Sequence, residues 1–356
     1  KWYQNYEKIF NIYNTICTFN FKVASRIPVI LLSSGIWEYS RNNMTIDDFI
    51  NLSPEKNAEF VINTNKILNM DLIWSAAGCN NLVLKALGAN TTFDKLGFSS
   101  DVNNPLLITP DDIDKLDINL IENSRDIENL LDATRIIVNE VGGEYLIGIS
   151  QWGPFTLAGF LYGLESFMKI CIKDTAAAQH ILQKTSDFVL KYLSLFADAG
   201  AELICQSEPT SSGDLISPRM FKNLVVPFLK RTNDEISSKV LVRMTHICGN
   251  TNKIVDYINE INTNLFSVDY KVDMQRAKLS EKTVIAGNIN PVETMLKGSA
   301  VDVKNKAQRC CQMISKGGDY ILMPGCDIPA STPLENILAI VETAHNFKYY
   351  RKTAYE

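Results

Sequence analysis

Apolar residues along the chain follow two alternating patterns. Short runs of aliphatic and β-branched residues are separated by longer stretches in which apolar positions recur every three or four residues. The first pattern is typical of buried strands and the second of amphipathic helices. We predict eight strands, at residues 28–33, 71–76, 145–150, 202–206, 240–245, 265–268, 283–288 and 320–324.

Helical stretches lie between the predicted strands. Residues 175–197 carry apolar side chains at helical spacing, and the aromatic-rich residues 1–18 are also expected to be helical. Ser217–Pro218 is a typical helix start, because serine can cap the helix and proline fits its first turn. Thr332–Pro333 repeats this pattern ahead of a helix predicted at residues 334–345.

The order of these elements predicts the fold. Strands that alternate with helices form parallel sheets, and eight such units favour a closed barrel. We therefore predict an α/β fold, a single (β/α)8 TIM-type barrel over residues 28–346. An N-terminal helical segment (residues 1–27) and a C-terminal tail (residues 347–356) would flank it. Residues 78–123 interrupt the alternation with Asn-rich turns, so we expect an elaborated loop over one face of the barrel.

Composition narrows the class of protein. Hydrophobic residues make up 46% of the chain and charged residues 21%, which is enough for a large buried core. A net charge of −5 and a pI near 5.4 argue against a nucleic-acid partner. No apolar run approaches the roughly 20 residues that span a membrane, so no membrane partner is expected. Without a secretory pattern, the eight cysteines are expected to be reduced thiols or metal ligands in a cytoplasmic protein.

Three metal-ligating residues follow two of the predicted strands. His246 and Cys248 come just after residues 240–245, and Cys326 follows residues 320–324. Side chains two positions apart on a strand point to the same side, and barrel enzymes place their sites at the carboxyl ends of strands. Three N and S ligands suit zinc and leave a fourth position for a substrate. Because histidine and cysteine are also common core residues, the spacing alone leaves both interpretations open.

Several short segments in the second half of the chain occur in a characteristic order. They are Gln151–Ala158 (QWGPFTLA), Asp214–Pro218 (DLISP), Thr245–Asn250 (THICGN), Ser267–Tyr270 (SVDY), Gly287–Asn288, Pro324–Cys326 (PGC) and Thr332–Asn336 (TPLEN). Together they resemble the methylcobalamin:coenzyme M methyltransferases of the uroporphyrinogen decarboxylase superfamily. The resemblance covers about residues 145–346 and is loose over residues 1–140.

The resemblance implies a uroporphyrinogen decarboxylase-like barrel that binds Zn²⁺ and moves a methyl group from a methyl-corrinoid to a thiol such as coenzyme M. It implies that His246, Cys248 and Cys326 are the zinc ligands. Relatives carry an acidic residue at the position of Glu208, which would be a fourth ligand or an anchor for the site. The alternative is an acidic residue that caps a loop.

Other strand-end residues are candidates for contact with the substrate. Gln151, Asp269 and Asn288 are predicted to orient the acceptor by hydrogen bonds, and the alternative is that they satisfy loop backbone at the rim. Gly249 would let the backbone approach the cofactor, with Asn250 beside it. These assignments depend on where each predicted strand ends.

The corrinoid is expected to arrive on a separate protein. Corrinoid-binding proteins usually supply a cobalt ligand from an Asp-x-His-x-x-Gly segment, and none of the three histidines here has an aspartate two positions before it. The expected partners are therefore a corrinoid protein and a small thiol substrate.

Other functions stay open at this point. Uroporphyrinogen decarboxylase binds its carboxylate-rich substrate through arginines in an N-terminal segment, and residues 28–39 here contain no arginine. A family methyltransferase with a different donor or acceptor, such as a thioether, an amine or tetrahydrofolate, is a closer alternative. A corrinoid chaperone or sensor is a non-enzymatic one.

Overall fold

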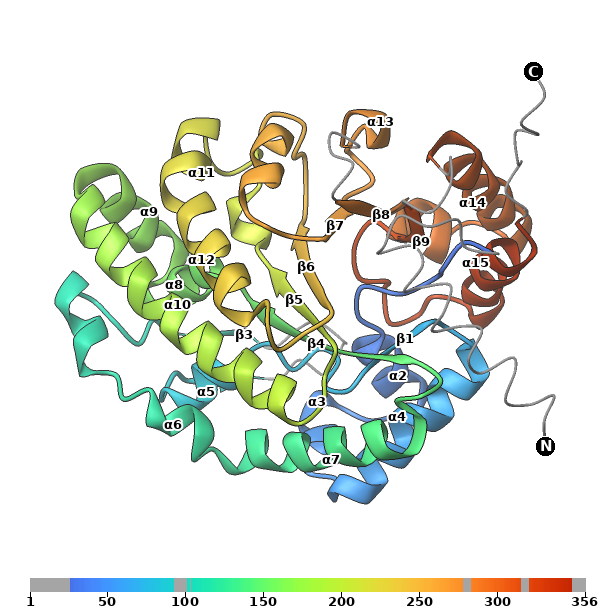
Figure 1. Ribbon diagram of the computed structural model, residues 1–356, viewed down its shortest axis with the longest axis horizontal. Helices are drawn as coiled ribbons and strands as arrows, with labels where there is room; N and C mark the ends of the chain where they lie inside the picture. Colours follow the sequence, from blue (N-terminus) through green and yellow to red (C-terminus); the bar gives the residue numbers. More distant parts are fainter. Residues whose placement is uncertain (1–25, 93–100, 103, 278–282, 315–319, 348–356) are drawn as a thin grey trace.

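The structure is a computed structural model that describes residues 26–92, 101–102, 104–277, 283–314 and 320–347. Strands line the centre of the molecule and helices surround them (Figure 1). The helix predicted at residues 1–18 and nearly all of the predicted C-terminal tail lie outside the described residues.

Seven parallel strands form one curved sheet in the order β1-β4-β5-β6-β7-β8-β9. They are β1 (Leu72–Trp74), β4 (Leu146–Trp152), β5 (Leu203–Ser207), β6 (Val242–Ile247), β7 (Leu265–Val268), β8 (Val284–Ile289) and β9 (Tyr320–Pro324). Each lies within a few residues of a predicted strand, so these seven predictions are confirmed. The sheet order follows the chain order, as expected for successive strand–helix units.

The strand predicted at residues 28–33 is reduced to a single bridging residue, Val29, which pairs in parallel with Leu322 of β9. Leu322 N donates to Pro28 O at 2.9 Å, and Ile30 N donates to Leu322 O at 3.1 Å. On its other side, Val29 O accepts from Asp71 N at 3.0 Å, just before β1. This segment therefore joins β9 to β1 and closes the barrel.

Two features keep this closing segment short. Pro28 has no N–H to donate, so it cannot extend a ladder. Farther along, Leu31 O accepts from the indole Nε1 of Trp74 at 2.8 Å, and a side chain thus takes the place of a strand partner. The prediction of a full strand was wrong because the apolar pattern does not report these competing bonds.

A buried ion pair fixes the closing segment against β1. The Arg26 guanidinium contacts both carboxylate oxygens of Asp71, at 2.6 and 2.8 Å. The same carboxylate accepts from Val29 N at 2.8 Å. Because an unpaired buried charge is costly, each partner requires the other, and together they hold residues 26–29 in place.

Helices surround the strands. The longer ones are α4 (Pro54–Leu68), α7 (Arg125–Val141), α8 (Pro154–Tyr162), α9 (Leu164–Lys173), α10 (Thr175–Asp198), α12 (Val226–Ile236), α14 (Ala300–Ile314) and α15 (Leu334–Asn346). The shorter ones are α2 (Gly35–Arg41), α3 (Ile46–Ile50), α5 (Leu82–Ala86), α6 (Asn119–Glu122), α11 (Pro218–Leu224), α13 (Met274–Ala277), the 3-10 helices η1 (Pro110–Lys115), η2 (Pro209–Ser211) and η3 (Val255–Glu260), and the π-helix η4 (Pro291–Leu296). Among the described helices none is by itself long and apolar enough to span a membrane, and α8 with α9 reaches that length only as a pair bent by 111°.

The predicted helix starts had different outcomes. Ser217 Oγ accepts from Met220 N at 3.2 Å and Pro218 is the first residue of α11, which confirms that start. The Thr332 hydroxyl instead donates to Pro329 O at 2.7 Å, so it does not cap α15. Pro333 takes the N-cap position of α15, so Thr332 is one residue too early in the chain to cap it.

Residues 78–123 hold several short elements rather than one strand–helix unit. Besides α5, η1 and α6, β2 (Thr91–Thr92) pairs with β3 (Asp101–Val102) in a small antiparallel sheet. The described part of this segment thus agrees with the expected departure from regular alternation.

The strands separate two apolar layers. Each strand contributes inward-facing side chains to the inner layer, which fills the barrel. They include Leu72, Leu146, Leu203, Val242, Leu265, Val284 and Ile321. The outer layer packs between strands and helices. Since side chains alternate along a strand, this inner set shows which later residues of each strand also face the interior.

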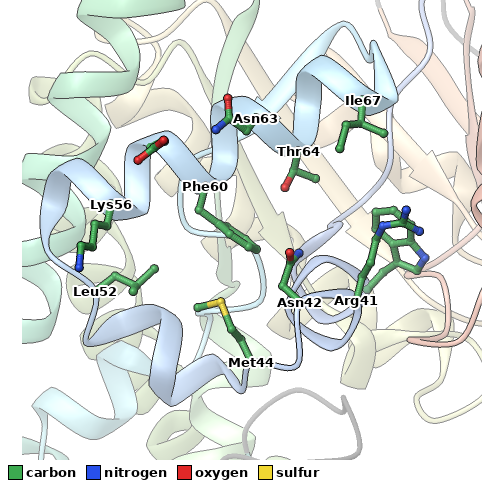
Figure 2. A pocket seen from close by; sticks show the side chains of 11 residues that line it. Arg41, Asn42, Met44, Leu52, Lys56, Phe60, Asn63, Thr64 and Ile67 are labelled. Atoms are coloured by element: carbon green, nitrogen blue, oxygen red, sulfur yellow. The ribbon is translucent and has the colours of Figure 1, made fainter.

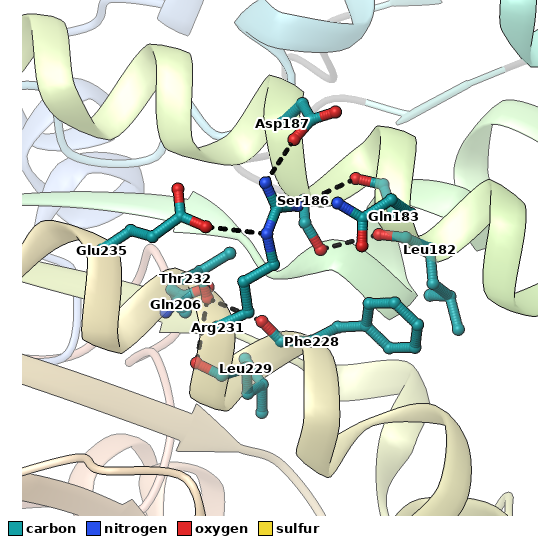
Figure 3. A network of polar contacts seen from close by, with 10 residues as sticks. All are labelled: Leu182, Gln183, Ser186, Asp187, Gln206, Phe228, Leu229, Arg231, Thr232 and Glu235. Atoms are coloured by element: carbon teal, nitrogen blue, oxygen red, sulfur yellow. Dashed lines mark hydrogen bonds and ion pairs between the residues drawn. The ribbon is translucent and has the colours of Figure 1, made fainter.

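Polar contacts tie the outer helices to each other and to the sheet (Figure 3). Arg231 of α12 binds Asp187 of α10 at 2.7 Å and Glu235 at 2.8 Å. The next residue, Thr232, donates its hydroxyl to Gln206 Oε1 of β5 at 2.7 Å. Gln206 therefore faces the helices.

Candidate functional site

The three predicted metal ligands converge at the carboxyl ends of β6 and β9. His246 Nε2 lies 2.8 Å from Cys248 Sγ and 3.9 Å from Cys326 Sγ, and the two sulfur atoms are 3.2 Å apart. The imidazole is buried, whereas both thiols are partly exposed. The structure thus brings together residues that the sequence places up to 80 positions apart.

The spacing of the three donor atoms suits a zinc ion. Zinc bonds of about 2.3 Å to sulfur and 2.0 Å to nitrogen in a tetrahedron place ligand atoms roughly 3.5–3.8 Å apart. The observed separations of 2.8, 3.2 and 3.9 Å lie on both sides of that range. One nitrogen and two sulfur donors favour zinc over magnesium or calcium, and a set of three leaves one position open.

The two thiols do not ionise independently. The hydrogen bond from Cys248, together with nearby His246, lowers the pKa of Cys326 to about 5. The same hydrogen bond, together with burial, raises the pKa of Cys248 well above its usual value. A divalent ion would favour both sulfurs as thiolates.

His246 has a second contact, which the sequence did not predict. Its Nδ1 lies 2.8 Å from Ser267 Oγ, and the two residues are direct register partners on β6 and β7. Ser267 is fully buried. Strand alternation from Leu265, which faces the interior, would have identified Ser267 as inward-facing, although it carries no signal for a particular partner.

The Glu208 backbone N–H donates to His246 O at 2.8 Å, while its side chain points to the start of α8. Its carboxylate accepts from Phe155 N at 2.9 Å, from Thr156 N at 2.8 Å and from the Thr156 hydroxyl at 2.6 Å. Burial raises the pKa of Glu208 to about 7, while these hydrogen bonds lower it. In this structure the carboxylate caps the start of α8, and a role as a fourth ligand stays a prediction.

Gln151 faces the helices rather than the barrel interior, which corrects the prediction that it orients the acceptor. It is the register partner of Gln206, and it lies on the same face of β4 as Ile149 of the outer layer. Its Oε1 accepts from Trp152 N at 2.6 Å. The prediction ended the strand at residue 150, but β4 continues to Trp152. Alternation therefore turns Gln151 outward.

Asp269 and Asn288 hold loop backbone at the barrel rim. Asp269 accepts from Gly249 N and from Lys271 N, both at 3.0 Å. Asn288 Nδ2 donates to Val272 O at 2.9 Å and to Asp269 O at 3.2 Å. The alternative stated for these residues, rim positions that satisfy loop backbone, describes the contacts that the structure shows.

The turn after Cys248 depends on glycine. Gly249 has a φ of +78°, and a Cβ built on it would lie 2.8 Å from Asp214 Oδ2. Asn250 N donates to the same carboxylate oxygen at 3.0 Å. Gly249 and Asn250 thus pack against the Asp214 loop, and whether they also contact a cofactor stays a prediction.

A surface groove of 390 Å³ lies elsewhere, against α2 and α4 (Figure 2). Phe60 and Met44 line its apolar side, and Arg41 stacks over the Trp37 ring at 5.4 Å. Its lining includes neither histidine nor cysteine. The candidate metal ligands lie instead at the barrel mouth.

A closed α/β barrel with a nitrogen–sulfur ligand set at its carboxyl end defines the class of this protein. Residues 14–347 match the uroporphyrinogen decarboxylase (URO-D) family, and the chain belongs to that family. A solved methyltransferase from Methanosarcina mazei has the same fold, with a TM-score of 0.81 at 23% identity over 94% of this chain and 98% of that one.

Curated relatives fall into two groups. Methylcobamide:CoM methyltransferase MtaA of Methanosarcina barkeri is 32% identical over 234 residues, which is 65% of this chain and 66% of the relative. The chain thus spans just under two thirds of that relative's length. A methylated-thiol–coenzyme M methyltransferase of Methanosarcina mazei is 29% identical over 265 residues (73% and 69% of the two chains). A uroporphyrinogen decarboxylase of Thermodesulfovibrio yellowstonii is 24% identical over 313 residues (85% and 88%).

Proposed function

We propose that this protein is a zinc-dependent enzyme that moves a methyl group between a methyl-corrinoid and a thiol such as coenzyme M. The observation that carries the proposal is the convergence of His246, Cys248 and Cys326 at the barrel mouth. Relatives named as methylcobamide:CoM and methylated-thiol–coenzyme M methyltransferases support the choice of reaction. The pairing of two thiolates with one histidine favours thiol alkylation over water activation, for which more neutral ligand sets are common.

The geometry suits activation of a thiol. Bound zinc would supply a deprotonated acceptor, because coordination removes the proton from a thiol whose ordinary pKa is near 8.5. Cys248 and Cys326 would contribute two negative charges, and an incoming thiolate a third, against a dication. The excess negative charge keeps the acceptor sulfur nucleophilic. Transfer forms a carbon–sulfur bond and breaks the carbon–cobalt bond, with the electron pair left on cobalt.

The methyl donor would come to the barrel mouth from outside the chain. The partial exposure of both thiols leaves that side of the ligand set accessible. A separate corrinoid protein is the proposed carrier, because none of the three histidines stands in an Asp-x-His-x-x-Gly segment. Docking at the carboxyl ends of the strands would bring the methyl group to the ligands.

The test follows methylcobalamin absorbance under anaerobic conditions with coenzyme M, other small thiols and tetrahydrofolate as separate acceptors. Thiol-dependent loss of methylcobalamin is expected. Cys248→Ala and Cys326→Ser should abolish it, because the acceptor is then neither deprotonated nor positioned. Cys171→Ala, a buried thiol on α9, is the matched control and should stay active.

Two results would overturn the proposal. Turnover that persists in Cys248→Ala would show that the ligand set is not used. Decarboxylation of a porphyrinogen without thiol-dependent demethylation would assign the chain to the other group of relatives. Activity with tetrahydrofolate alone would keep the methyltransferase class and replace the acceptor.

A further inference from the structure

β7 and the residue that follows it contact the segment His246–Gly249 at two points. Ser267 Oγ lies 2.8 Å from His246 Nδ1, and Asp269 accepts from Gly249 N at 3.0 Å. Ser267 is in β7, and Asp269 is the first residue after it. The first contact reaches a ligand, and the second reaches the residue that follows the ligand Cys248.

The Ser267 contact decides which imidazole nitrogen is free to bind a metal. A neutral imidazole carries one proton, on either nitrogen. If Nδ1 donates its proton to Ser267 Oγ, Nε2 presents a lone pair toward the two sulfurs, which lie 2.8 and 3.9 Å away. Ligating histidines in metalloproteins usually have such a partner on the other nitrogen.

A serine at this position has a particular electrostatic consequence. A carboxylate partner would add negative charge to a site that already holds two thiols, whereas a hydroxyl orients the ring and adds none. Both Ser267 and His246 are almost fully buried, so water does not compete with this hydrogen bond. The contact is therefore built into the interior of the barrel.

The rim adds further support to the same arrangement. Asn288 of β8 donates to the carbonyls of Asp269 and Val272, which fixes the loop after β7. Asp269 in turn holds the Gly249 amide. A continuous chain of hydrogen bonds therefore runs from β8 through β7 to the ligand segment of β6.

We propose that Ser267 is the positioning residue of the metal centre, where it fixes His246 as an Nε2 ligand, and that Asp269 holds the Cys248–Gly249 segment beside it. This inference rests on the proposed zinc site. It assigns Asp269 to the support of the ligands, in place of contact with the acceptor.

The test compares Ser267→Thr with Ser267→Val. These two side chains have nearly the same size, and only threonine keeps the hydroxyl. Zinc affinity, measured by competition with a chromophoric chelator, should stay near wild type in Ser267→Thr and fall about 10- to 100-fold in Ser267→Val. The visible absorption bands of the Co²⁺-substituted protein should shift only in the valine variant, because they report the ligand field.

Ser207→Ala is the matched control. Ser207 is the register partner of His246 on its other side, in β5, but its hydroxyl contacts Ser150 at 3.3 Å and not the imidazole. This variant should bind zinc as wild type does. Circular dichroism and thermal unfolding show whether each variant is folded, and the threonine–valine comparison cancels any packing cost that they share.

The outcomes separate the two proposals. Equal zinc affinity and equal Co²⁺ spectra in Ser267→Thr and Ser267→Val would overturn the role of Ser267 and leave the zinc site intact. Loss of affinity in both variants to the same extent would show a packing effect and also overturn it. Failure of the wild-type protein to bind zinc through His246, Cys248 and Cys326 would instead refute the proposed function.

Discussion

The sulfur atoms of Cys248 and Cys326 lie 3.2 Å apart although they follow strands that are not neighbours. β7 and β8 separate β6 from β9 in the sheet. In a flat sheet, strands three positions apart would be about 14 Å from each other. Curvature and the inward direction of both side chains remove that separation, so the pairing of Cys248 with Cys326 depends on the barrel.

Removal of metal should make this thiol pair sensitive to oxidation. A disulfide requires a sulfur–sulfur distance of about 2 Å, which is a movement of little more than 1 Å from the observed one. Chelated protein treated with a mild disulfide oxidant should lose about 2 Da by intact mass, with Cys248 and Cys326 linked in a peptide map. Zinc-loaded protein is the control and should resist. Two free thiols in the treated, metal-free protein would contradict the prediction.

The fold should survive the loss of zinc. The inner and outer apolar layers are extensive, and a barrel of this size does not depend on a metal to fold, unlike a small zinc domain. Far-UV circular dichroism of chelated protein should match that of the zinc-loaded form. Global unfolding on chelation would show that the ligand set has a structural role.

Glu208→Gln should lower stability without loss of zinc. One amide oxygen cannot replace two carboxylate oxygens that accept from Phe155 N, Thr156 N and the Thr156 hydroxyl, and the new NH₂ group would face a donor. We expect a decrease of about 1–3 kcal/mol in the free energy of unfolding. Metal analysis should still find about one zinc per chain. A folded variant with reduced zinc content would instead support Glu208 as a fourth ligand.

Glu38 should make stability fall as pH rises. Burial raises its pKa from 4.5 to about 7, and a hydrogen bond from Ser34 offsets this only in part. The folded state therefore holds the proton more tightly than the unfolded state. The resulting stabilisation is complete below about pH 4.5 and is lost as the pH approaches 7, a change of about 3 kcal/mol.

Glu38→Gln removes this titration and gives the matching test. Relative to wild type, the variant should be more stable by up to about 3 kcal/mol near pH 8 and nearly unchanged near pH 4.5. Denaturant unfolding at the two pH values measures both differences. The exposed Glu128 on α7 provides a control, Glu128→Gln, that should show little difference at either pH. An equal effect of Glu38→Gln at both pH values would rule out the assignment.

The sequence predicted best those features that depend on residues close to each other in the chain. His246, Cys248 and Cys326 could be placed because strand ends and side-chain alternation need only neighbouring residues. Gln151 was placed just past the end of a strand that in fact continues to Trp152, so it is a strand residue and alternation turns it toward the helices. Local patterns are reliable for the direction of a side chain only where the strand boundary is right.

Contacts between distant segments could not be predicted in this way. The helix that Glu208 caps begins more than 50 residues earlier in the chain, so its role as a cap was visible only as one of two options. Ser267 had no role before the structure, because a buried serine beside a histidine depends on the register between β6 and β7. The strand at residues 28–33 was predicted too long, because an apolar run does not report that Leu31 O accepts from the Trp74 indole in place of a strand partner.

The contact between the Val29 segment and β9 is the weakest connection between neighbouring segments of the barrel wall. Ile30 and Leu322 share one of the few backbone bonds across this join, whereas the ladders from β4 to β9 each pair several residues. Local opening should begin there, and amide deuteration at Ile30 should precede that within β5 or β6. Cys326 follows β9 directly, so opening of the join would carry it away from Cys248. A ligand bound to both sulfurs would therefore also oppose this local opening of the barrel.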